Sequence, residues 1–275
     1  MHILFIGYGK TSQRVAKQLF ELGHQLTTIS RTPKTDLYAH HLIQDVHQLN
    51  LTQVQPIDCV YILLAPNESG IEQYHQTYLV STQPIIQALQ QHPIQRLIVV
   101  SSTRVYGENL GETIHDDTVI RPIDRQGEIL YAMENAYLTA FPQQCCVLRP
   151  SGIYGTSVAR MIRLAKSTQQ YSNIHWSNRI HIEDLVRFLV YLLHVEHLQQ
   201  TYICSNSQPM VLHEIIQWFQ RHLHLPELNL VCRTISGKKI IAQRMKDSGF
   251  ELKHSDCFQD YLALLNEINL EEENG

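Results

Sequence analysis

Three small residues near the start of the chain have the spacing of a phosphate-binding turn. Gly7, Gly9 and Ser12 form the pattern G-x-G-x-x-S between an apolar run at residues 2–6 and an amphipathic segment. The first glycine of such a turn permits a tight bend, and the second lets the backbone approach a pyrophosphate, whose charge the following helix N-terminus stabilises. The pattern therefore predicts a dinucleotide site. We expect its contacts at Gly7, Tyr8, Gly9, Lys10, Thr11 and Ser12.

Ser12 occupies the position of the third glycine, where the motif needs close packing of the helix against the strand. A serine is small, so we expect it to be tolerated with a slightly wider crossing. Because a lone glycine pattern is a weak signal, the alternative is an ordinary strand-to-helix turn that binds nothing. The apolar run before the loop and the amphipathic segment after it favour the dinucleotide site.

The end of the second apolar run carries the residues expected to recognise the ribose. An NAD site usually has an acidic side chain about 20 positions after the glycine loop. This chain has Ser30 and Arg31 there. A hydroxyl and a guanidinium suit the 2′-phosphate of NADP, with Lys10 as a second cation. The sequence favours NADP, with NAD as second choice, and the alternative for Arg31 is a solvated side chain.

The elements that must position these residues follow from the hydrophobic pattern. Apolar runs at 2–6, 25–29, 41–43, 58–64, 96–101 and 145–148 alternate with helical periodicities. This alternation is typical of βαβ units. We predict further helices at 73–91, bent near Pro84, and at 128–140. The fold class is therefore α/β, a Rossmann-type doubly wound parallel sheet with a small C-terminal substrate-facing lobe.

The domain organisation predicted from this pattern is a single extended Rossmann unit over 1–275. Residues 1–155, with about 180–204, form its NAD(P)-binding core, and 156–179 and 205–275 form the substrate lobe. The segment 171–179, rich in Tyr, Asn, His and Trp, is expected to be a loop.

The composition excludes several classes of partner. A net charge of −4 over 275 residues provides no positive field for nucleic acid. The longest apolar stretches, 59–66 and 185–193, are shorter than the roughly 20 residues of a spanning helix, and no secretion signal is visible. We expect a cytoplasmic protein with a small-molecule substrate and no membrane or nucleic-acid partner.

The cysteines and histidines do not have the spacing of a metal site. The six cysteines form no C-x-x-C pair, and most lie in apolar runs, so we expect reduced, structural thiols. The sixteen histidines form no ligand set in the linear sequence. We therefore predict no metal.

Three further motifs identify a family resemblance. They are S-S-T-R-V-Y-G at 101–107, L-R-P-S-G-I-Y-G at 148–155 and R-I-H-I-E-D-L at 179–185. Together with the N-terminal loop, in this order and spacing, they resemble the extended short-chain dehydrogenase/reductases of the NAD-dependent epimerase/dehydratase family. The end of the chain resembles an atypical bacterial subgroup.

The resemblance assigns roles to several residues. It implies that the Ser102 hydroxyl contacts the reacting oxygen, that Tyr106 contacts substrate, and that Arg179 grips a substrate diphosphate. The alternatives are a turn-capping hydroxyl for Ser102 and a surface side chain for Arg179. The cofactor contacts implied by the resemblance are Ala65, Pro66, Ser101, Pro150 and Ser151.

The Tyr and Lys pair that the family uses for proton transfer is missing. Glu134 matches the acidic residue that follows this pair, which places Gln126 at the tyrosine position and Leu130 at the lysine position. Tyr131 is a shifted candidate for the acid, but the residue four positions on is Asn135, which cannot lower the pKa of a phenol.

Two functional hypotheses remain open. The first is an NAD(P)-dependent epimerase, dehydratase or reductase acting on a polar, nucleotide-sugar-like substrate without the usual pair. The second is a non-catalytic NADP(H)-binding sensor or partner module. A homodimer, as in many relatives, would pack through the helices at 73–91 and 128–140.

Overall fold

The computed structural model describes residues 1–68 and 70–273 of the chain. The chain forms two compact units, each assembled from separated segments. Unit 1 comprises Met1–Gly107, Val119–Arg149 and Val186–Tyr202, and unit 2 comprises Glu108–Thr118, Pro150–Leu185 and Ile203–Gly275. None of the described helices is long and apolar enough to cross a bilayer.

A seven-stranded sheet forms the centre of unit 1. Its order is β11-β7-β5-β4-β1-β2-β3, and neighbouring strands from β7 to β3 pair in parallel. The strands are β1 (His2–Ile6), β2 (Gln25–Ser30), β3 (His40–Ile43), β4 (Cys59–Ile62), β5 (Arg96–Val100), β7 (Cys145–Pro150) and β11 (Thr201–Cys204). This arrangement confirms the predicted Rossmann-type sheet, whose direction of winding reverses between β1 and β4.

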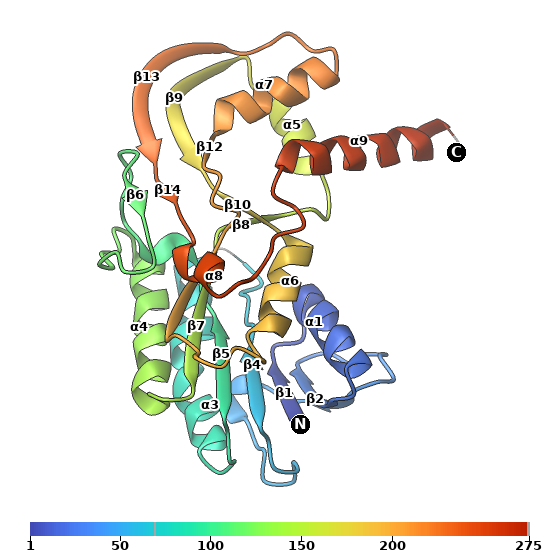
Figure 1. Cartoon of the computed structure of the whole chain (residues 1–275), viewed down its shortest axis with the longest axis vertical. Coiled ribbons are helices and arrows are strands. Elements are labelled where there is room, and N and C mark those ends of the chain that lie inside the picture. Colours follow the sequence, from blue (N-terminus) through green and yellow to red (C-terminus); the bar gives the residue numbers. More distant parts are fainter. Residues whose placement is uncertain (69, 274–275) are drawn as a thin grey trace. The chain divides into compact units, whose positions relative to one another are not determined.

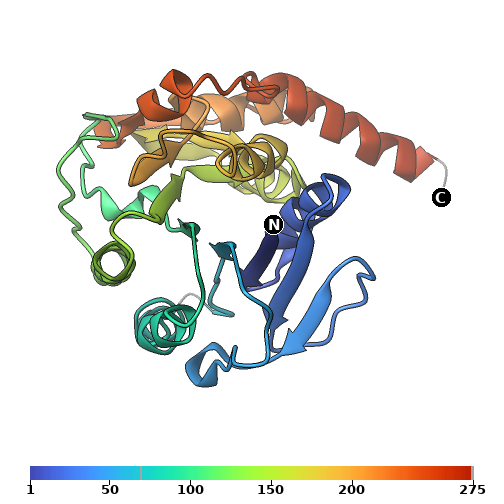
Figure 2. The same cartoon turned by 60° about the horizontal axis from the view of Figure 1, so that its bottom comes forward.

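Helices on both faces of the sheet explain why its central strands are continuous apolar runs. Every residue of β1 and β4 is buried. Helix α1 (Lys10–Glu21) lies on one face, and α3 (Thr82–Leu89) and α4 (Arg125–Ala140) lie on the other (Figures 1 and 2). The connections contain short helices at η1 (Val46–Gln48) and η3 (Thr103–Val105).

The helix predicted at 73–91 is interrupted in the structure by an irregular turn. The segment contains α2 (Ile71–Tyr74), a π-helical turn η2 (His75–Val80) and then α3. Pro84 lies in the first turn of α3, where a missing N–H leaves no helical hydrogen bond unmade. The irregularity of this segment is the π-helical turn, which ends at Val80, four residues before Pro84.

Unit 2 contains short sheets and five helical segments. The strand pairs are β8 (Gly152–Tyr154) with β10 (Arg179–His181) and β6 (Thr113–Ile114) with β14 (Lys239–Ile240), beside a three-stranded sheet of β12 (Met210–Val211), β9 (Gln170–Ser177) and β13 (Asn229–Gly237). The helices are α5 (Ala159–Ser167), α6 (Ile182–Tyr191, which continues into unit 1), α7 (Leu212–His222), α8 (Gln243–Asp247) and α9 (Cys257–Glu273).

The segment expected to be a loop at 171–179 is mostly strand. It forms β9, which pairs with β12 and β13 and in which the residues from Asn173 to Ser177 are half-buried. The prediction failed because the segment lacks apolar alternation and is ordered by pairing with distant strands.

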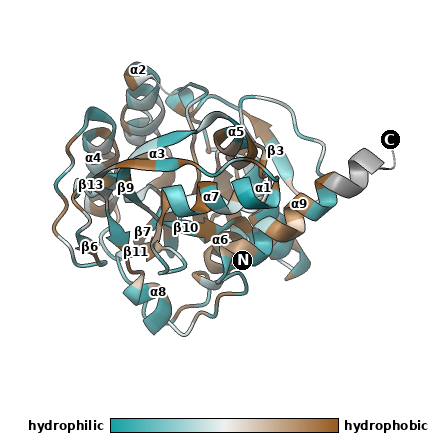
Figure 3. Cartoon of the chain, turned by 90° about the horizontal axis from the view of Figure 1, so that it is seen from above, coloured by the Kyte–Doolittle hydropathy of each residue, from teal (hydrophilic) through white to brown (hydrophobic). Residues whose placement is uncertain are grey.

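Unit 2 buries an apolar cluster of its own. Hydrophobic and hydrophilic residues alternate along α7 and α9 (Figure 3), and the buried side chains include Ile215 and Phe219 of α7 with Cys257 and Leu265 of α9. Asp116, only 5% exposed, links distant segments because its carboxylate accepts hydrogen bonds from the backbone N–H groups of Ile203 and Arg244 at 2.7 and 3.0 Å.

Candidate functional site

The glycine loop joins β1 to α1 in unit 1, and its two glycines have different constraints. Gly7 has φ +88°, and a Cβ there would lie 2.3 Å from the carbonyl oxygen of Leu63. At Gly9, the N-cap of α1, a Cβ would meet no heavy atom of the described residues within 4 Å, apart from the adjoining residues of the loop and helix themselves. No side chain caps α1 and no acidic residue lies in its first turn. The helix N-terminus and the open space at Gly9 fit the pyrophosphate of a dinucleotide.

The other loop side chains differ in how a ligand could reach them. Tyr8 is 2% exposed and its hydroxyl donates to that of Tyr38 at 3.2 Å. A ligand at the loop would therefore contact Tyr8 through its backbone. Ser12 is buried, and its Oγ donates to the Gly7 carbonyl oxygen at 2.7 Å. Lys10 is exposed and Thr11 is half-buried. Ser12 therefore strengthens the turn with a bond that a third glycine could not make.

The predicted ribose site brings the ends of β2 and β4 together. The Arg31 side chain is exposed, and its Nη2 donates to Oδ1 of Asn67 at 3.0 Å. Asn67 directly follows Ala65 and Pro66, two of the predicted cofactor contacts. Ser30 Oγ donates to the backbone oxygen of Thr32 at 2.7 Å, which leaves the hydroxyl oxygen able to accept.

A buried ion pair supports the alignment from which the missing catalytic pair was inferred. The Glu134 carboxylate is fully buried and accepts from Nε and Nη2 of Arg149, the latter at 2.7 Å. Burial works against the charged form of Arg149, but the bonds to Glu134 outweigh it and raise its pKa. Arg149 also donates to the Tyr106 hydroxyl at 2.8 Å. Leu130 is only 1% exposed, so an apolar core side chain stands at the lysine position.

This pair also defines the surroundings of Tyr106. The side chain is 1% exposed, and its hydroxyl is held by Arg149. Tyr106 thus has a packing role in unit 1, and no local spacing in the sequence predicts its arginine partner, which lies 43 residues away. Contact between Tyr106 and a substrate stays a prediction.

The candidate catalytic residues have the following surroundings. Ser102 is the N-cap of η3, and its Oγ accepts from the backbone N–H of Arg104 at 3.2 Å, so the expected alternative role as a turn cap is present. The buried Oγ of Ser101 has no hydrogen-bond partner among the described residues. Tyr131 is half-buried on α4. Assignment of these residues to catalysis stays a prediction.

Pro150 and Ser151, two of the predicted cofactor contacts, begin the second segment of unit 2. Ser151 is 5% exposed, and its backbone N–H donates to the Cys204 oxygen at 2.9 Å. Its Oγ donates to the Ser205 hydroxyl at 3.2 Å.

Arg179 lines a pocket of about 270 Å³ in unit 2. The residue is only 7% exposed, and its Nε donates to the Tyr261 hydroxyl at 2.9 Å. Its Nη1 is buried and has no hydrogen-bond partner within the described part of the chain. Arg160, Asn178 and Tyr261 also line the pocket. A buried guanidinium with an unused donor favours an anionic ligand, because such a charge is costly without a partner.

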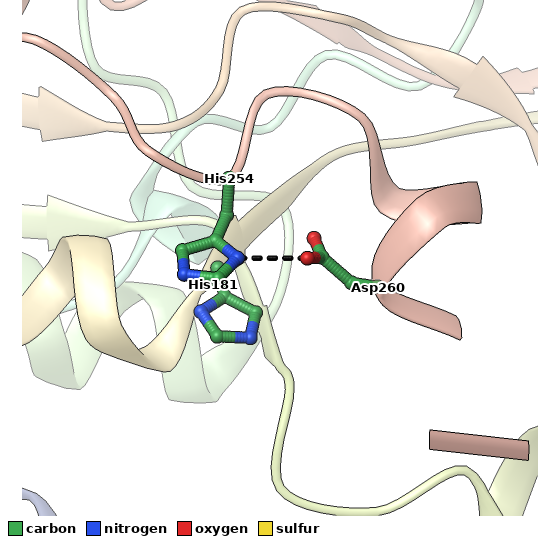
Figure 4. Close-up of side chains that lie close together, drawn as sticks. All are labelled: His181, His254 and Asp260. Carbon is green, nitrogen blue, oxygen red and sulfur yellow. Dashed lines mark hydrogen bonds and ion pairs between the residues drawn. The ribbon is translucent and has the colours of Figure 1, made fainter. Parts of the chain in front are cut away.

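A second group of side chains in unit 2 comes from β10, from the segment between α8 and α9, and from α9. Single ligand atoms of His181, His254 and Asp260 lie within 4.8 Å of one another (Figure 4). The two imidazole rings are stacked, with centroids 3.6 Å apart and an angle of 18° between their planes. A metal ion lies near the plane of each imidazole that binds it, so stacked rings cannot both bind one ion without rotating. The arrangement therefore does not fit a formed metal site.

Sequence reasoning missed this cluster and the pocket residues Arg160 and Tyr261. Tyr261 lies 82 residues from Arg179, to which it is hydrogen-bonded, and His254 lies 71 residues from Glu183. Contacts between residues so far apart cannot be predicted from local spacing in the sequence.

Comparisons with known proteins agree with this geometry. Protein YeeZ of Escherichia coli (strain K12) is 27% identical over 161 residues, a match that covers 58% of this chain and only 57% of that relative's length. A candidate NAD-dependent epimerase/dehydratase from Methylobacillus flagellatus is 27% identical, with a TM-score of 0.84 and 98% coverage of both chains.

The fold is also that of an enzyme solved with both of its ligands. UDP-glucuronic acid 4-epimerase from Bacillus cereus, in complex with UDP-glucuronic acid and NAD, has a TM-score of 0.78 at 16% identity, covering 98% of this chain and 100% of the other. The sequence model of the NAD dependent epimerase/dehydratase family matches residues 7–203, well over half of the chain. The predicted resemblance is thus confirmed: the chain belongs to the NAD dependent epimerase/dehydratase family.

Proposed function

We propose that the protein binds NADP(H) at the loop between β1 and α1 and acts on a polar substrate that carries a phosphate or diphosphate. The observation that carries this proposal is the open space at Gly9 beside an uncapped helix N-terminus. The bound dinucleotide supplies the hydride chemistry, and the chain binds and orients it.

The preference for NADP over NAD rests on the end of β2. Ser30 and Arg31 stand where an NAD site usually has a carboxylate, and the exposed Arg31 guanidinium can form charge-assisted bonds to a 2′-phosphate. Such bonds are worth about 1.5–3 kcal/mol, or about tenfold to a hundredfold in affinity.

Calorimetric titration of NADPH and NADH tests the cofactor assignment. Arg31→Ala is expected to weaken NADPH binding by about tenfold to a hundredfold and to change NADH binding by less than about threefold. The matched control is Lys17→Ala, which removes an exposed cation of α1 that lies 4.0 Å from Glu21. Equal losses for both nucleotides would reject the 2′-phosphate contact, and a wild-type protein that binds neither would reject the function.

For the substrate, the supporting observation is the unpartnered Nη1 of Arg179 in the unit 2 pocket. A nucleotide sugar, like the ligand of the Bacillus cereus enzyme, has a diphosphate of the required charge. Arg179→Ala is expected to abolish binding of UDP-glucose or UDP-glucuronic acid, whereas Arg163→Ala, on the same helix as Arg160, should leave it unchanged.

Proton transfer is proposed for the Ser102 hydroxyl, with Tyr131 as a secondary candidate. Ser102 Oγ accepts from Arg104, which leaves its own proton free to donate to a substrate oxygen. A screen of carbonyl and nucleotide-sugar substrates with NADPH should give turnover that Ser102→Ala diminishes. Unaltered turnover would remove Ser102 from the mechanism, and Tyr131→Phe tests the second candidate in the same assay.

A second candidate function is a non-catalytic NADP(H) sensor. The observation that favours it is Leu130, buried at the position where the family has its lysine. Tight NADPH binding without hydride loss over the whole substrate screen, together with a partner protein bound only in one redox state, would favour the sensor over the enzyme.

We also propose a cytoplasmic location and a homodimer that packs through α3 and α4. Cell fractionation tests the location. Sedimentation at micromolar concentration tests the dimer, and a monomer there would reject it.

A further inference from the structure

The first turn of α9 connects the anion pocket to the histidine cluster. Asp260 and Tyr261 are consecutive residues at its start. Tyr261 accepts the hydrogen bond from Arg179 Nε at 2.9 Å. Asp260 accepts from the Tyr154 hydroxyl at 2.5 Å through one carboxylate oxygen, and its other oxygen contacts His254 Nδ1 at 2.7 Å. The position of Tyr261, and with it that of Arg179, is therefore tied to the bonds of Asp260.

His254 is held by charged or titratable groups from three elements. Its Nδ1 contacts Asp260 of α9, and its Nε2 contacts Glu183 of α6 at 3.1 Å. Its ring stacks on His181 of β10 (Figure 4). Asp184 of α6, fully buried, accepts from the backbone N–H of His254 at 2.8 Å, so the residue is fixed through its backbone as well.

The two carboxylates determine the charge of this imidazole. A neutral histidine has only one N–H, so bonds from both ring nitrogens to carboxylate oxygens require the protonated form. Partial burial opposes the charge, but the bonds to Asp260 and Glu183 outweigh it and raise the pKa of His254. Burial, and next the charge of His254, lower the pKa of His181. His181 also accepts at Nδ1 from the Glu183 N–H at 3.2 Å, which fits a neutral ring.

We propose that protonated His254 is a positioning residue that holds Asp260 between itself and Tyr154, and thereby holds Tyr261 against Arg179 in the geometry that binds the substrate's diphosphate. This inference rests on the proposed substrate site. His254 is protonated in the folded protein at pH values below its raised pKa, and its contribution to affinity is lost as the pH rises through that pKa. Affinity for the anion should therefore fall with rising pH.

The experiment measures UDP-glucose binding by calorimetry from about pH 5.5 to about pH 8.5. UDP-glucose is chosen because its diphosphate is a diester, whose charge does not change in this interval. Wild-type affinity should fall by about fivefold across the interval, in the usual range of coupling between two sites. His254→Gln should bind weakly at all pH values, with a flat profile. The control is His115→Gln, an exposed histidine of unit 2, which should behave as wild type.

Asp260→Asn is a second variant in case His254→Gln does not fold. It removes the carboxylate while keeping the shape of the side chain, and should also flatten the pH profile. NMR titration of the histidine rings provides a readout independent of affinity, in which His254 should titrate above the ordinary histidine pKa of about 6.5.

The outcomes separate the two proposals. If UDP-glucose binds, Arg179→Ala abolishes binding, and His254→Gln keeps the wild-type pH dependence, only the role of His254 is overturned. If wild type does not bind UDP-glucose, or if Arg179→Ala binds it normally, the proposed substrate site fails and takes this inference with it. A pH dependence that disappears on addition of a chelator would indicate a bound metal ion and would also overturn the proton-dependent role.

Discussion

Replacing each glycine of the N-terminal loop by alanine should separate folding from cofactor binding. At Gly7, a Cβ would lie 2.3 Å from the Leu63 carbonyl oxygen, and φ is +88°. A left-handed alanine costs about 1–2 kcal/mol and the overlap about 1–3 kcal/mol, so Gly7→Ala should lower the free energy of unfolding by about 2–5 kcal/mol. At Gly9, the space is open and φ is −90°. The weaker helix cap and the reduced freedom of the unfolded chain nearly cancel, within about 1 kcal/mol.

Gly9→Ala should lower NADPH affinity although it leaves the stability of the protein nearly unchanged. Its new methyl group would occupy the space through which the pyrophosphate reaches the N–H groups of α1. Loss of one charge-assisted bond lowers NADPH affinity by about tenfold to a hundredfold. We would measure the thermal midpoint and NADPH affinity of both variants. Gly9→Ala should melt within about 4 °C of wild type. NADPH affinity equal to wild type in this variant would refute the proposed approach of the pyrophosphate, and an unchanged midpoint for Gly7→Ala would refute the steric argument.

Three further predictions concern the cores of the two units. Glu134→Ala leaves the Arg149 guanidinium buried without a carboxylate and should cost about 3–5 kcal/mol in urea unfolding, whereas Glu128→Ala, which breaks an exposed pair, should cost about 1 kcal/mol or less. Burial raises the pKa of every described cysteine thiol, so in a Cys232→Ser background a thiol reagent at about pH 8 should label the protein only after unfolding. Rapid labelling of the native protein would contradict this burial. Leu130→Lys should not restore catalysis. It should lower the free energy of unfolding by about 3 kcal/mol or more, because the Leu130 side chain is 1% exposed. Wild-type stability of this variant in urea would show that the site admits water.

The parts of the fold that the sequence predicted are those whose signals are local. The first strand, the glycine turn and the start of α1 lie within about a dozen consecutive residues, and the apolar runs of the central strands follow from burial on both faces. By contrast, β9 has no alternating pattern because it is ordered by β12 and β13, which lie far along the chain. The π-helical turn before α3 also has no composition that distinguishes it from an α-helix.

The candidate site divides in the same way. Gly7 and Gly9 could be recognised because the conformation that requires a glycine, and the space that a ligand would fill, are set by neighbouring residues. Arg179 was found only through the family motif. Its partner Tyr261 and the contacts of His254 depend on the return of the C-terminal segment to β10 and α6, which no spacing in the sequence predicts.

The linkage made by Asp116 affects the order in which the chain can fold during synthesis. Its partners Ile203 and Arg244 follow it by 87 and 128 residues, so a nascent chain exposes this carboxylate long before either backbone N–H has been made. Unit 1 has all its residues once Tyr202 has left the ribosome, whereas unit 2 still lacks its third segment. Since domains fold as their residues emerge, chains stalled after Tyr202 has left the ribosome, but before Arg244 has, should contain a protease-resistant unit 1 and a cleavable segment around Asp116.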